Sequence, residues 1–105
     1  MRRNSVIAST AIVVLGTTVA IAQGGDARSA RSLAASCANC HGTAGVSVGD
    51  VESLAGKPRE EIVRKMQEFK SGARPSTIMT QLAKGYTDEQ IEALAGWFAA
   101  QKSAK

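Results

Sequence analysis

Apolar residues recur at helical spacing in the middle of the chain. Ile62, Met66 and Phe69 lie four and three residues apart, which places them on one stripe of a helix. Pro58 is suited to the first turn of this helix, and Ser71-Gly72 is expected to end it. No segment shows the strict alternation that predicts a β-strand. The pattern therefore predicts an all-α fold.

A second stripe lies near the end of the chain. Thr87 and Gln90 have the spacing of a capping box, so a helix is expected to begin after Thr87. The apolar positions of this helix share one face and are Ile91, Leu94, Ala95 and Phe98. Trp97 lies beside that face.

Glycines mark the other boundaries. A first helix is expected to start at Asp26 and to run into residues 37–41, where Gly42 ends it. Residues 42–56 carry four glycines and predict a loop, as do residues 73–80. A short helix is predicted over residues 79–84, stopped by Gly85.

The N-terminus has the pattern of an export signal. Arg2 and Arg3 precede an uncharged, largely apolar run at residues 6–20, and Ala20-Ile21-Ala22 matches a small-x-small cleavage site. We expect residues 1–22 to be a cleaved signal peptide and residues 23–105 to be one domain in the periplasm. The alternative is an uncleaved membrane anchor, since the apolar run is at the lower limit for crossing a bilayer.

The sequence Cys37-Ala38-Asn39-Cys40-His41 has the spacing of a covalent haem attachment site. Two thiols three positions apart face the same way on a helix, so each can add to one vinyl group of a porphyrin. His41 then projects toward the same face and can bind iron. The sequence predicts one covalently bound haem c.

Other interpretations of the cysteine pair are a thioredoxin-like motif, half of a zinc site or a structural disulfide. A structural zinc site needs four ligands, and Cys37, Cys40 and His41 are the soft candidates of this chain. The residues before Cys37 look helical, whereas a thioredoxin-like motif follows a strand.

The second axial ligand must come from another residue type, because His41 is the sole histidine. Met66 belongs to the apolar stripe, where a flexible core side chain is the simpler role. Met79 follows a loop that can carry it over the opposite face of the haem, so we expect Met79 to be the ligand. With both axial positions filled by protein, the iron would carry electrons rather than bind a substrate.

Composition excludes some functions. The net charge of +4 is mild and the basic residues are scattered, which does not predict a nucleic-acid partner. The four aromatic residues leave a small core, to which a haem would add apolar mass.

These features resemble the class I c-type cytochromes over essentially all of residues 23–105. Residues 53–56, 69–79 and 82–91 are similar to the cytochrome subunit of flavocytochrome c sulfide dehydrogenase. The resemblance implies an all-α class I cytochrome c fold, with helices packed around one haem. It also implies that Trp97 packs against Ser29 or Ala30, where the first and last helices cross.

Three more residues are candidates for the haem environment. The guanidinium of Arg74 is a candidate to neutralise a haem propionate. Tyr86 and Trp97 are candidates to donate a hydrogen bond to a propionate. For each, an ordinary surface or core role is the alternative. Family members commonly have proline after the glycine of the first loop, where Gly49 is followed by Asp50 here. Another backbone carbonyl is then needed to orient His41.

The resemblance implies a function in electron transfer, with no catalytic residue in this chain itself. The expected partners are an FAD-containing flavoprotein that oxidises sulfide and a downstream redox acceptor, with no nucleic acid and no membrane unless the signal segment is retained. Alternatives are a free carrier serving a terminal oxidase or reaction centre, a thiol–disulfide or metal-binding protein, and a haem peroxidase with displaceable Met79.

Overall fold

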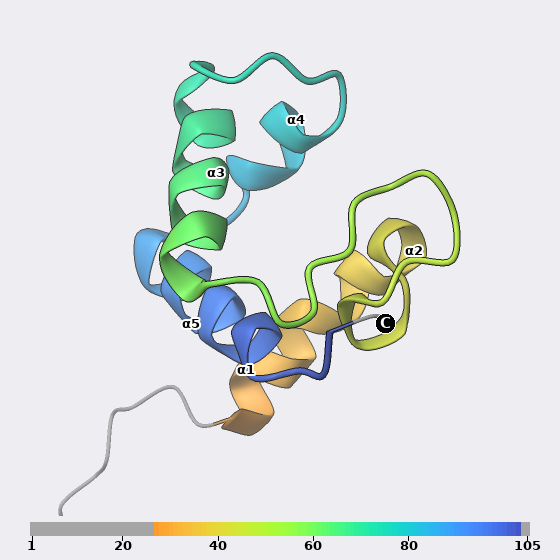
Figure 1. Cartoon of the computed structure of the whole chain (residues 1–105). Coiled ribbons are helices and arrows are strands. Elements are labelled where there is room, and N and C mark those ends of the chain that lie inside the picture. The colour runs from red at the N-terminus through yellow and green to blue at the C-terminus, as the bar shows by residue number, and fades with distance from the viewer. Residues whose placement is uncertain (1–26, 104–105) are drawn as a thin grey trace, which may run out of the picture.

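The computed structural model describes residues 27–103, and every regular element in that range is helical, as predicted (Figure 1). The elements are α1 (Ala27–Ala34), α2 (Ala38–His41), α3 (Arg59–Ser71), α4 (Met79–Ala83) and α5 (Asp88–Ala99), with short 3-10 turns at Ala35–Cys37 and Thr43–Gly45. The predicted signal peptide and Asp26 lie outside the described residues. No helix within residues 27–103 combines the length and apolar character needed to cross a bilayer.

The core lies where α1, α3 and α5 pack together. Its buried residues are Ala34, Ile62, Leu94, Ala95 and Phe98. The apolar face predicted for α5 is confirmed, since all four of its residues are buried. Small side chains at the buried positions of α1 let this helix approach α5 closely.

The end of α3 follows the predicted signal, whereas its start lies one residue later than predicted, because Pro58 precedes the first turn instead of lying in it. Pro58 is the residue just before the helix, Glu60 and Glu61 lie in its first turn, and Gly72 ends it in the left-handed conformation at φ 83°. Carboxylates near a helix N-terminus interact favourably with the helix dipole. Figure 1 shows α3 beside α5, with α4 against the far end of α3.

The start of α5 is fixed by the predicted capping box. The Gln90 N–H donates to Thr87 Oγ1 over 3.1 Å, and the Thr87 N–H donates to Gln90 Oε1 over 2.9 Å. Two backbone donors at the helix N-terminus are thereby satisfied.

The first predicted helix is not continuous. The 3-10 turn at Ala35–Cys37 separates α1 from α2, so Cys37 ends one element and Cys40 lies in the next. Gly42 ends α2 as predicted, at φ 82° and ψ 164°, a conformation in which a Cβ would overlap the carbonyl of Val46. The backbone can therefore turn sharply straight after His41.

Candidate functional site

The cysteine pair and His41 lie together on the 3-10 turn and α2. Cys37 is half-buried and Cys40 is exposed, and neither forms a disulfide with another described residue. Burial raises the pKa of the Cys37 thiol, whereas reactive redox cysteines have a lowered pKa. Within residues 27–103, no three His, Cys, Asp or Glu side chains gather as metal ligands do. The raised pKa of the Cys37 thiol therefore does not favour a thiol–disulfide site.

The His41 ring is oriented by a backbone carbonyl. Its Nδ1 lies 2.6 Å from the carbonyl oxygen of Glu52. A carbonyl can only accept a hydrogen bond, so Nδ1–H is the donor; in the neutral ring, Nε2 then carries the lone pair. This is the tautomer that an iron ligand requires. The predicted need for another carbonyl is met by Glu52, which no sequence pattern marks for this role.

Met79 is the first residue of α4 and is half-buried. Its N–H donates to Ser76 Oγ over 3.0 Å, which ties the start of this short helix to the preceding loop. This contact of Ser76 was not predicted from the sequence. Met66 instead packs against the core cluster, as predicted.

The other predicted haem neighbours have protein partners. Arg74 donates to Glu68 Oε2 from Nε over 2.8 Å, and its Nη2 lies 2.6 Å from the same oxygen. Tyr86 Oη lies 3.3 Å from the Oγ of Ser36, the residue just before Cys37. Contacts of Arg74, Tyr86 and Trp97 with a propionate stay predictions.

Trp97 packs against the core cluster, which contains Ala34 of α1, and meets Phe98 edge to face at 5.0 Å. The predicted crossing of the first and last helices is therefore present. Ser29 and Ala30 line a shallow groove with residues nearer the start of α5, such as Gln90 and Ala93. The contact of Trp97 with Ser29 or Ala30 stays a prediction.

The described residues fit a large apolar cofactor. Five of the nine buried hydrophobic residues are alanines, so the protein core has little apolar mass. By contrast, Ile78 and Leu82 beside Met79 are 60% and 51% exposed, and Val51 beside Glu52 is 43% exposed. Burying such side chains under an apolar ring is favourable. A porphyrin would use both the free Nε2 of His41 and this uncovered apolar surface.

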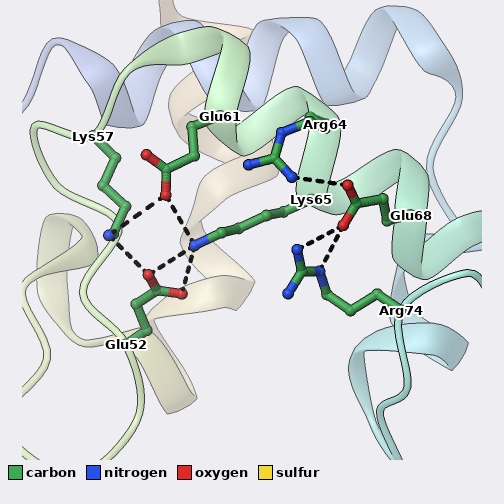
Figure 2. Close-up of polar contacts among 7 residues, drawn as sticks. All are labelled: Glu52, Lys57, Glu61, Arg64, Lys65, Glu68 and Arg74. Carbon is green, nitrogen blue, oxygen red and sulfur yellow. Dashed lines mark hydrogen bonds and ion pairs between the residues drawn. The ribbon is translucent and has the colours of Figure 1, made fainter.

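An ion-pair network borders the site (Figure 2). The Glu52 carboxylate lies 2.7 Å from Lys57 Nζ and 2.9 Å from Lys65 Nζ, and Lys65 is also 2.9 Å from Glu61. Hydrogen bonds from Lys57 and Lys65 lower the pKa of Glu52 to about 2. The carboxylate is therefore charged at neutral pH.

No family model matches the chain, but individual proteins do. The cytochrome subunit of sulfide dehydrogenase from Chlorobaculum tepidum is 47% identical over 66 residues, which are 63% of this chain and 60% of that protein. Cytochrome c-553 from Helicobacter pylori is 37% identical over 80% of this chain and 88% of its own length. This chain belongs to the class I c-type cytochromes. Its cofactor is accordingly covalently bound haem c.

A solved structure agrees with the cytochrome fold. The crystal structure of reduced cytochrome c4 from Pseudomonas stutzeri matches with a TM-score of 0.69 and 27% identity, covering 77% of this chain and 48% of that chain. This cytochrome thus spans 60% of the sulfide dehydrogenase subunit and about half of the cytochrome c4 chain.

Proposed function

We propose that this cytochrome is periplasmic and carries single electrons on one haem held by four residues. Cys37 and Cys40 form the thioethers, His41 is the proximal ligand and Met79 the distal one. The proposal includes export by residues 1–22, leaving residues 23–105 as the mature domain. The observation that carries it is the His41 ring, whose Nδ1–H is engaged by Glu52 and whose Nε2 is free.

Bound haem supplies an iron that gains or loses one electron. His41 is held by its hydrogen bond, so its imidazole keeps one orientation in both oxidation states. The Met79 thioether is a neutral, weak donor, which favours reduced iron and raises the reduction potential. With His41 and Met79 both bound to it, the iron would have no site left for a substrate.

The proposed electron donor is the FAD-containing subunit of a sulfide dehydrogenase. Support comes from the 47% identical Chlorobaculum tepidum subunit and from the resemblance of residues 69–79 and 82–91 to that group. The cytochrome would pass each electron on to a further redox acceptor.

Purification from the native host without overexpression tests the partner. We expect the cytochrome to elute from a sizing column with a yellow flavoprotein, and added sulfide to reduce its haem within the complex. A free cytochrome that a flavoprotein cannot reduce would contradict the sulfide dehydrogenase assignment and favour a free carrier. An exported chain without covalent haem would contradict the four-residue assignment itself.

A further inference from the structure

Glu52 contacts both the proximal histidine and the ion-pair network. Its carbonyl accepts from His41 Nδ1 over 2.6 Å, while its carboxylate binds Lys57 and Lys65 (Figure 2). Lys65 reaches both carboxylate oxygens, at 2.9 and 3.3 Å. The residue therefore links the proximal ligand to helix α3.

The loop that carries Glu52 is held in part by its own hydrogen bonds, since Ser53 Oγ accepts from the Ser47 N–H over 2.9 Å. Val48 is fully exposed and Val51 is 43% exposed, and Asp50 stands where a proline would stiffen the backbone. The carbonyl of Gly45 accepts from the N–H groups of Leu54 and Ala55 over 2.8 and 3.1 Å. These bonds fix the loop just after Glu52, but none of them uses the Glu52 carbonyl, which pairs with His41.

Helix α3 offers a firm anchor. Lys65 lies in the middle of this 13-residue helix, and its side chain is 24% exposed. Glu61, one turn earlier, binds the same ammonium group over 2.9 Å and holds it in place. A network in which each charge has two partners orders its side chains better than an isolated surface pair does.

We propose that Glu52 is a positioning residue for the proximal ligand. Its ion pairs with Lys57 and Lys65 tie the loop to α3, which fixes the carbonyl that orients His41. This inference rests on the proposed role of His41 as the proximal ligand. The strength of the Nδ1–H bond in turn tunes the donor strength of Nε2.

The test compares three variants of the haem-loaded protein by the exchange rate of the His41 Nδ1 proton, measured by NMR in the reduced state. Glu52→Gln removes a negative charge and Lys65→Met removes a positive charge. A pure charge effect would move the exchange rate in opposite directions in these two variants. Glu68→Gln is the matched control, because Glu68 lies on α3 and pairs with Arg64 of that helix and with Arg74 of the following loop, without contacting Glu52.

Glu52→Gln and Lys65→Met should both raise the exchange rate of the His41 Nδ1 proton. We expect about a fivefold increase for Glu52→Gln, less for Lys65→Met because Lys57 remains, and under about twofold for Glu68→Gln. Lys65→Met also carries the test if Glu52→Gln does not mature. Equal exchange in Glu52→Gln and Glu68→Gln would overturn the positioning role alone. A wild-type protein without a protected Nδ1 proton would overturn the proximal assignment as well.

Discussion

Replacement of Gly42 by alanine should weaken the protein at the point where the chain leaves His41. Gly42 has φ 82° and ψ 164°, a region that residues with a Cβ almost never occupy. The added Cβ would overlap the Val46 carbonyl and lie 2.9 Å from Ser47 Cα. Both neighbours are backbone, so a side-chain rotation cannot relieve the contact.

The magnitude follows from two separate costs. Backbone strain costs about 1–3 kcal/mol and overpacking about 1–3 kcal/mol, so the free energy of unfolding should fall by about 2–6 kcal/mol. That is a large part of the roughly 5–15 kcal/mol stability of a typical domain. Denaturant unfolding of the haem-loaded protein, followed by far-UV circular dichroism, measures it.

Gly72→Ala is the matched control. Gly72 has φ 83° and ψ 3°, but an added Cβ there would meet no atom within 4 Å. The expected loss is only about 1–2 kcal/mol, from the left-handed conformation itself. Equal losses in the two variants, within about 0.5 kcal/mol, would refute the argument from close backbone approach.

Three further predictions concern the ligand, a helix cap and pH. Met79→Ala should lower the reduction potential by on the order of 0.1 V, within the roughly 0.8 V range that axial ligands span. An unchanged potential in spectroelectrochemistry would exclude Met79 as the ligand. Thr87→Ala should lower the free energy of unfolding, measured by thermal unfolding, by about 1 kcal/mol, because it removes the helix cap. Thr77→Ala, at an exposed position outside the helices, is the control and should leave the free energy of unfolding nearly unchanged. The pKa of Glu52 falls from 4.5 to about 2 on folding, so its ion pairs stabilise the protein above pH 4.5 and are lost as the pH drops toward 2. Glu52→Gln should flatten that part of the stability curve; parallel curves for the variant and the wild type would contradict the assignment.

Local sequence signals predicted much of this fold. The capping box at Thr87, the glycine after α3 and the apolar face of α5 each depend on residues within a few positions, and each is present. The break between α1 and α2 was not predicted. Ala35, Ser36 and Cys37 are compatible with either an α-helix or a 3-10 turn, so their sequence does not distinguish the two.

The contacts that orient His41 could not be predicted from the sequence for a different reason. Every residue has a backbone carbonyl, so nothing in the side chain of Glu52 marks its carbonyl as the acceptor for His41. The pairing of Glu52 with Lys65 spans 13 positions and depends on how the loop returns to α3. Likewise, the sequence does not show that the Arg74 guanidinium pairs with the Glu68 carboxylate, as it does in the folded chain.

The alanine-lined interior has a consequence for the life of the protein in the cell. A polypeptide with so little apolar mass of its own gains its cohesion when the prosthetic group is captured, so maturation and folding should be one event. Chains that leave the maturation machinery empty should be degraded by proteases. The abundance of intact chains would then report directly how many are competent for redox work.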